Sequence, residues 1–191
     1  MLVLDDPRWL DLNHRGWSAG RASSSDPDAP FVPDELRHLL ANPADRQRFT
    51  VLWPYLCSEG TAWPAAYASV PYLVEIARQL PPAERFEHMY VVGLVVMRSG
   101  SYGRTSNGLP ADIAAAYRHA LPEALTLLAE TLAAPHDPVT TRYLLAAAAA
   151  LKGHPTLGDV LQDLDVITMC PNCGKPAPGL LDPTSGQPSD P

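Results

Sequence analysis

The stretch CSEGTAWPAAYASVPYLVEIARQL, residues Cys57–Leu80, decides the fold. Its apolar side chains recur at steps of three and four residues, which is the spacing of one helical face; they are Tyr67, Val70, Leu73, Val74 and Ala77. We expect Gly60 to end the preceding helix, Thr61 to cap the next one, and Pro64 to lie in its first turn, where a proline removes no hydrogen bond. Pro71 lies inside the pattern and predicts a kink or a break there.

The same spacing predicts further helices on both sides of this stretch. They cover residues 33–41, 43–57, 82–98, 111–134, 138–152 and 156–164. The helix over 82–98 is apolar almost all round, which is typical of a central helix. Gly93 within it costs about 1 kcal/mol relative to alanine, so we expect a neighbouring helix to pack closely against it. Only Val166–Met169 resembles a strand, and the sequence therefore predicts an all-α fold of stacked antiparallel helix pairs.

Three parts of the chain differ in composition. Residues 1–32 predict an irregular arm that Trp9 and Trp17 pin onto the helices. Residues 33–165 hold the helical patterns and predict one helical-repeat domain. Residues 166–191 hold a cysteine knuckle and a tail rich in proline, glycine and serine, which has little to bury and predicts disorder.

Composition limits what the chain does. It has 191 residues, 46% of them hydrophobic, which is enough to bury one sizeable core. No apolar run approaches the roughly 20 residues of a membrane-spanning helix, the start does not resemble a secretory signal, and three cysteines predict no disulfide framework. We therefore expect a cytoplasmic protein. A net charge of −7 argues against binding nucleic acid and is compatible with a basic protein partner, while the oligomeric state stays open.

Three helix starts share a proline, an acidic residue and an arginine. They are Pro43–Arg46, Pro82–Arg85 and Asp137–Arg142, and each leads into an apolar run that ends at a glycine. The first two prolines have a spacing near the roughly 40–47 residues of two-helix HEAT-type repeats, and the loop Ser99–Pro110 accounts for the longer second interval. Such helix pairs cannot bury their apolar faces alone, so we expect them to stack.

Part of the chain resembles a group of bacterial HEAT-repeat-like proteins. The resemblance is carried by Ala41–Gly60 and by the runs EGTAWPAA, residues 59–66, and SVPYL, residues 69–73; Pro135–Gly153 is similar to a generic HEAT helix. It covers roughly residues 33–153 and implies an α-solenoid, a role as a protein-interaction scaffold and no catalytic residues. The arginine–aspartate ladder of regular HEAT arrays is incomplete here, which leaves the number of repeats open.

The motif CPNCG, residues 170–174, is the sharpest chemical signal. It is typical of a zinc-ribbon knuckle, in which two thiolates lie on one tight turn. Zinc takes four ligands and no second Cys-x-x-Cys is present, so Cys57, His136 or His154 would have to lie close by, or another chain would complete the site. A redox pair is the other interpretation, but it needs a helix N-terminus beside the cysteines. Zinc at Cys170 and Cys173 is therefore a hypothesis.

Two histidines lie four residues from a glutamate in the predicted helices. The pairs are Glu84 with His88 and His119 with Glu123. Di-iron helix bundles use a Glu-x-x-His spacing, which neither pair has. We interpret both as solvated pairs on helix surfaces.

Five residues are candidates for a binding surface: Trp53, Glu59, Trp63, Arg104 and Asn107. The two tryptophans are interface anchors if they line a groove and core residues otherwise. Glu59 precedes the Gly-Thr turn, where it either binds or helps to cap the helix. Arg104 and Asn107 lie in a long polar loop, which either meets a partner or only connects two helices.

The sequence contains no phosphate-binding loop, nucleophile elbow or His-Glu-x-x-His motif. It therefore assigns no catalytic residue, although this does not exclude an enzyme. We expect a protein-interaction module of the helical-repeat type, with an immunity-like or regulatory role. The alternative is a small zinc-binding protein or metal-dependent enzyme that uses Cys170 and Cys173.

Overall fold

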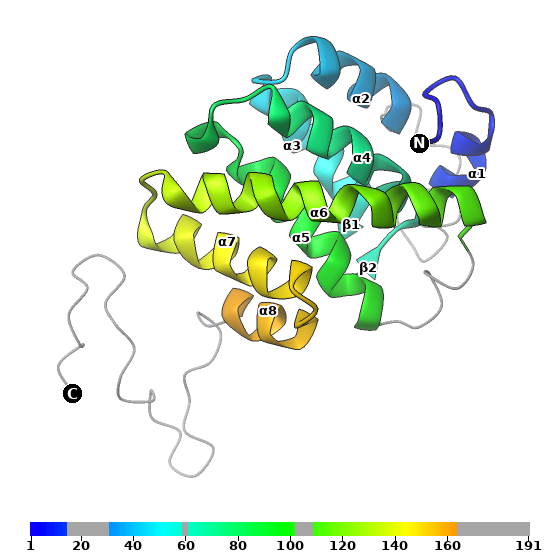
Figure 1. Ribbon diagram of the computed structural model, residues 1–191. Helices are drawn as coiled ribbons and strands as arrows, with labels where there is room; N and C mark the ends of the chain where they lie inside the picture. Colours follow the sequence, from blue (N-terminus) through cyan, green and yellow to red (C-terminus); the bar gives the residue numbers. More distant parts are fainter. Residues whose placement is uncertain (15–30, 59–60, 102–108, 164–191) are drawn as a thin grey trace, which may run out of the picture.

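The computed structural model describes residues 1–14, 31–58, 61–101 and 109–163 (Figure 1). Helices hold most of these residues, which confirms the all-α prediction. A 3₁₀ helix, η1 (Pro82–Glu84), precedes α5, and the strands β1 (Cys57–Ser58) and β2 (Thr61–Ala62) form a hairpin between α3 and α4. The helices are α1 (Arg8–His14), α2 (Val32–Ala41), α3 (Arg46–Leu56), α4 (Pro64–Arg78), α5 (Phe86–Ser101), α6 (Ala111–Ala133), α7 (Pro138–Leu151) and α8 (Pro155–Gln162).

Helix α4 lies at the centre of the described structure. Eleven of its fifteen residues are buried, and it contacts α1, α2, α3, α5 and α6. Pro64 occupies its first turn, as predicted, but the prediction that Thr61 caps it is wrong, because Thr61 pairs with Ser58 in the hairpin. The predicted break at Pro71 is also absent: α4 runs through it to Arg78. Packing on several sides holds the helix despite the lost hydrogen bond.

Side-chain caps and turns explain the helix boundaries that differ from the prediction. Helix α3 begins at Arg46 and not at Pro43, because the Asp45 side chain accepts a hydrogen bond from the Arg48 amide at 3.0 Å and caps the helix there. Pro82 lies in η1, so α5 begins four residues later and ends at Ser101. Gly153 follows α7 with a φ of 89°, a conformation that suits glycine at a helix end.

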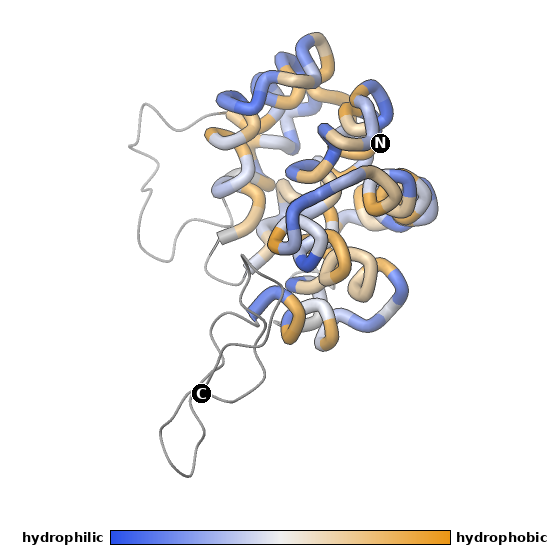
Figure 2. Tube along the Cα trace, turned by 90° about the vertical axis from the view of Figure 1, so that its left-hand side faces the viewer, coloured by the Kyte–Doolittle hydropathy of each residue, from blue (hydrophilic) through white to orange (hydrophobic). Residues whose placement is uncertain are grey.

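The helices contact one another in two series. Helix α2 contacts α4 and α4 contacts α6, while α5 contacts α7 and α7 contacts α8. Consecutive helices also contact each other within α2–α3, α4–α5 and α6–α7, and Figure 1 shows α6 and α7 side by side. In Figure 2 hydrophobic and hydrophilic residues alternate along the tube, as expected for helices with one buried face.

Glycine allows the close approach of α5 to α7, as the sequence predicts. A Cβ atom on Gly93 would overlap the Cβ of Ala147. A Cβ atom on Gly158 of α8 would lie 2.7 Å from the Met97 sulfur and 2.8 Å from the Ala146 carbonyl oxygen. These glycines bring α5, α7 and α8 into contact through backbone and small side chains.

The N-terminal arm is not wholly irregular, because it contains α1. Trp9 in this helix is fully buried, and its indole N–H donates to the Val3 carbonyl at 2.9 Å. The Tyr72 hydroxyl donates to the Leu2 carbonyl and ties the arm to α4. The prediction that Trp9 pins the arm is confirmed, whereas Trp17 lies outside the described residues.

The packing corrects the predicted solvated pair Glu84–His88, whereas nothing in the described structure contradicts the pair His119–Glu123, whose histidine is exposed on α6. His88 is only 3% exposed, so it is a core residue. The Glu123 carboxylate accepts a hydrogen bond from Arg78 of α4 at 2.6 Å. Glu84 lies in η1, before the helix that holds His88, so the two are not paired along one helix.

Candidate functional site

The hairpin β1–β2 places two predicted anchor residues at its two ends. Cys57 pairs with Ala62 across the hairpin, and the Cys57 amide donates to the Trp53 carbonyl, which closes α3. On the other strand, the Trp63 amide donates to the Leu56 carbonyl at 3.0 Å before α4 begins. Backbone hydrogen bonds of the hairpin thus fix the positions of Trp53, in the last turn of α3, and of Trp63, at the start of α4.

The two indole side chains differ in burial. Trp53 is 38% exposed, and Trp63 is half-buried. A tryptophan at the surface offers a large apolar ring together with an N–H donor, which is why this residue is enriched at protein interfaces. Of the two alternatives for Trp53, the surface position is the observed one.

Helix α3 has a core face and a distinct outer stripe. Phe49, Leu52 and Leu56 are buried against the core. Arg46, Thr50 and Trp53 are exposed and follow at steps of four and three residues, so they share another side of the helix. We call these three residues the α3 stripe. The Thr50 hydroxyl donates to the Arg46 carbonyl at 2.9 Å, within the helix.

The carboxylates nearest the start of α3 are already engaged. Asp45 accepts from the Arg48 amide and lies 2.9 Å from His38 Nε2, and these two hydrogen bonds, the first being the larger cause, lower the pKa of Asp45. The buried Glu35 pairs with Arg48 at 2.9 Å. No carboxylate in the described ranges pairs with Arg46, so its charge faces solvent.

A buried histidine lies beneath α3. The ring centroids of His88 and Phe49 are 4.3 Å apart, and neither His88 ring nitrogen has a hydrogen-bond partner among the described residues. Burial, and to a lesser extent the Arg46 charge, lowers the pKa of His88 to about 4. His88 is therefore neutral at neutral pH. The sequence analysis placed His88 on a helix surface, because its burial depends on contact with Phe49, which is distant in the chain.

A second polar cluster lies where α5 meets α8 and the hairpin. Arg98 pairs with Asp159 of α8 at 2.9 Å. The Arg98 charge also lies close enough to the Cys57 thiol and the Tyr90 hydroxyl to favour their ionised forms. Burial raises the pKa of Cys57 to about 12, although Arg98 opposes this, and burial followed by the neighbouring Tyr143 raises the pKa of Tyr90 to about 12. The cluster joins helices and holds no ionised nucleophile.

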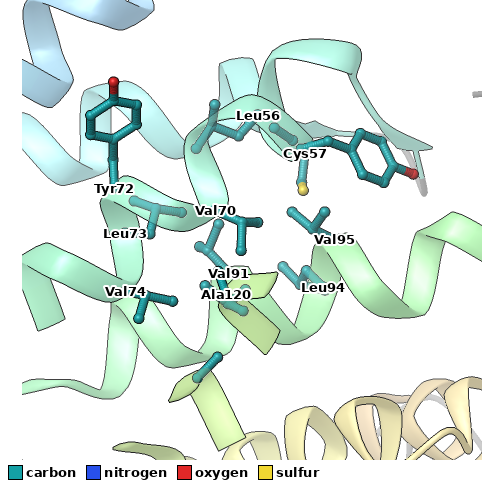
Figure 3. Close-up of a cluster of buried hydrophobic side chains, with 14 of the residues drawn as sticks. Leu56, Cys57, Val70, Tyr72, Leu73, Val74, Val91, Leu94, Val95 and Ala120 are labelled. Atoms are coloured by element: carbon teal, nitrogen blue, oxygen red, sulfur yellow. The ribbon is translucent and has the colours of Figure 1, made fainter. Parts of the chain in front are cut away.

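Cys57 is a core residue. Figure 3 shows its side chain among apolar neighbours that include Val95. It is only 4% exposed, and burial raises the pKa of its thiol. His136 Nε2 lies 2.7 Å from the Thr131 carbonyl, so that nitrogen is engaged in a hydrogen bond. Within the described residues no group of three histidine, cysteine, aspartate or glutamate side chains could hold a metal ion.

The remaining predicted site residues lie outside the described residues. They are Glu59, Arg104, Asn107, Cys170 and Cys173. The structure thus places Trp53 at the end of α3 and Trp63 just before α4, on either side of the hairpin, and the binding roles of all seven residues stay predictions. In the part of the chain that the structure describes, no helix combines the length and the apolar character needed to cross a membrane.

Comparison with protein-family models, with curated proteins and with solved structures returned no match for this chain.

Proposed function

We propose that the chain is a HEAT-like helical-repeat module that binds another protein through the α3 stripe and Trp63. The observation that carries the proposal is the 38% exposure of Trp53 on a helix whose other two aromatic residues, Phe49 and Tyr55, are buried and half-buried. An exposed tryptophan at the end of a packed helix, next to a hydrogen-bonded strand pair, is a preorganised apolar anchor. Such residues supply much of the free energy in protein interfaces.

The order of helix contacts supports the repeat interpretation. Three consecutive pairs, α2–α3, α4–α5 and α6–α7, contact internally, and their first helices contact in series. The salt bridges Arg78–Glu123 and Arg85–Glu130 link the second pair to the third. In a stacked array of this kind each pair buries the apolar face of its neighbour, and exposed side chains at one edge remain for binding.

A regulatory or immunity-like role is the narrower form of the proposal. It is supported by the small size of the chain, 191 residues, and by the exposure of Trp53 among the described residues. These features fit a small protein whose activity is to bind and thereby control another one. The support is an association between fold and role, so the partner must be identified by experiment.

Site-specific photo-crosslinking in cells tests this proposal. Thr50 lies between Arg46 and Trp53 and is exposed, so a benzoylphenylalanine residue in its place faces any bound protein. The matched control has the same residue in place of Ala115, which is exposed on α6. We expect a discrete crosslinked protein from position 50 only. Identical products from both positions, or none from position 50, would count against a binding surface on α3.

Zinc binding by Cys170 and Cys173 is the second candidate, and the CPNCG motif favours it. Zinc takes four ligands, so two more must come from elsewhere in the chain or from another chain. Metal analysis of the purified protein and of a Cys170→Ser variant distinguishes the outcomes. Stoichiometric zinc that the variant loses would support this candidate, and a folded wild-type protein without metal would remove it.

A further inference from the structure

The charged side chains within α3 itself are opposite in sign to the net charge of the whole chain. The helix Arg46–Leu56 contains two arginines, Arg46 and Arg48, and no acidic residue, whereas the chain carries a net charge of −7. Exposed charges further apart than about 8–10 Å are largely screened at physiological salt. The charge beside the contact therefore decides which partner is attracted, and the net charge of the chain does not.

Arg46 is the uncompensated cation of this helix. Arg48 pairs with the buried Glu35, and Asp45 is engaged by His38 and by the Arg48 amide. Most of the other arginines that the structure describes pair with carboxylates or, as Arg142 does, lie over an aromatic ring; the paired ones are Arg8, Arg37, Arg78, Arg85 and Arg98. Arg118 on α6 resembles Arg46, since it is exposed and no described carboxylate pairs with it.

The stripe sets a spacing for its partner. Arg46 and Trp53 are seven residues apart, which corresponds to two helical turns and to about 10 Å along the axis. Thr50 between them is small, so a partner helix can approach the stripe. A segment that fits has an apolar side chain against Trp53 and a carboxylate two turns away, at Arg46.

We propose that the α3 stripe binds an acidic amphipathic helix of another protein, with an apolar side chain on Trp53 and a carboxylate at Arg46. This inference rests on the proposed protein-binding function and specifies the chemistry of the partner. It replaces the basic partner that the net charge suggests. The apolar contact supplies most of the affinity, and the charge pair selects the sign of the partner.

A pair of synthetic peptides tests the sign of the charge. Both are amphipathic helices with the same leucines, but one carries glutamate and the other lysine at the polar positions. Each peptide bears a fluorophore, and its anisotropy is followed as the full-length protein is added. We expect the glutamate peptide to bind more tightly than the lysine peptide, with an affinity that falls as salt rises.

Variants locate the binding and separate the two proposals. Arg46→Gln should weaken the glutamate peptide about threefold, as expected for an exposed ion pair, while Arg118→Gln should change nothing. Arg46→Glu should reverse the preference between the peptides. Trp53→Ala should abolish binding of both, with circular dichroism confirming that the variant folds.

Several results would overturn the inference. Tighter binding of the lysine peptide, or no binding of the glutamate peptide, would reject an acidic partner, and the proposed function would stand if position 50 still crosslinks to a protein. Equal binding by the wild type and Trp53→Ala would reject the site. Self-association of the protein that Trp53→Ala removes would assign the stripe to a second copy of this chain instead.

Discussion

The N-terminal arm and helix α3 each contain a tryptophan, and the two residues differ in burial. Trp9 is fully buried, donates to a backbone carbonyl and lies 6.4 Å from the Tyr72 ring, centroid to centroid. Trp53 keeps 38% of its surface in solvent. Trp9 attaches the arm to α4. Helix α3 is instead packed onto the core by Phe49, Leu52 and Leu56, and its tryptophan stays partly exposed. A large apolar side chain that the fold leaves partly exposed is available for binding.

Alanine substitution of the two tryptophans gives the largest expected difference. Trp9→Ala leaves a cavity among buried side chains and should lower the free energy of unfolding by about 4 kcal/mol. Trp53→Ala removes a ring that is partly solvated and should cost clearly less, on the order of 2 kcal/mol. Urea unfolding followed by circular dichroism measures both. An equal decrease in the free energy of unfolding for both variants would show that Trp53 has the same structural role as Trp9.

His88 makes the core beneath α3 sensitive to pH. Its folded-state pKa of about 4 lies below the ordinary value of 6.5, so the unfolded chain binds more protons and stability rises with pH between these values. As pH falls from 6.5 to 4, the free energy of unfolding should decrease by up to about 3 kcal/mol. The lowered pKa of Asp45 and Asp137 affects stability only below and around 3.8.

A His88→Phe variant isolates this contribution. Phenylalanine keeps an aromatic ring against Phe49 and has no proton to take up. Its free energy of unfolding, measured in urea between pH 4 and 6.5, should vary less steeply than that of the wild type. A wild-type protein with no slope in this window would show that His88 is not desolvated as the packing implies.

The hydrogen bond between Tyr72 and Leu2 gives the smallest effect of the three. The hydroxyl is buried, and Tyr72→Phe leaves the Leu2 carbonyl without this donor. We expect a loss of about 1 kcal/mol together with faster proteolysis of the N-terminus. Arm attachment that persists unchanged in this variant would leave Trp9 as the main anchor of the arm.

Local patterns in the sequence predicted most of the helices. The apolar spacing located α4, α6 and α7 to within a few residues. Each of these helices buries one face, and the apolar residues of one face recur every three or four positions in the sequence. Thr61 was misassigned as a cap because its partner, Ser58, is set by a turn that periodicity does not reveal. The burial of His88 likewise depends on contacts with another helix.

The sequence predicted Trp53 as a candidate binding residue but did not predict the other residues of the α3 stripe. Trp53 stands out by its residue type, but whether it is buried is decided by how α3 packs. Arg46 was noted only as part of a repeated helix start and not as a binding residue. Net charge averages over the chain, and the pairing of Arg48 with Glu35 appears only in the folded structure. The steps of four and three residues from Arg46 to Thr50 and Trp53 are the signal that could have found the stripe.

Affinity capture with two single variants tests the central claim most directly. The tagged wild type, Trp53→Ala and Leu145→Ala are exposed to the same native lysate, and retained proteins are quantified by mass spectrometry. Leu145 is 46% exposed on α7, so it controls for the loss of an exposed apolar side chain elsewhere. We predict one stoichiometric protein that the wild type and Leu145→Ala retain and Trp53→Ala loses. Retention by a folded Trp53→Ala variant would contradict the account.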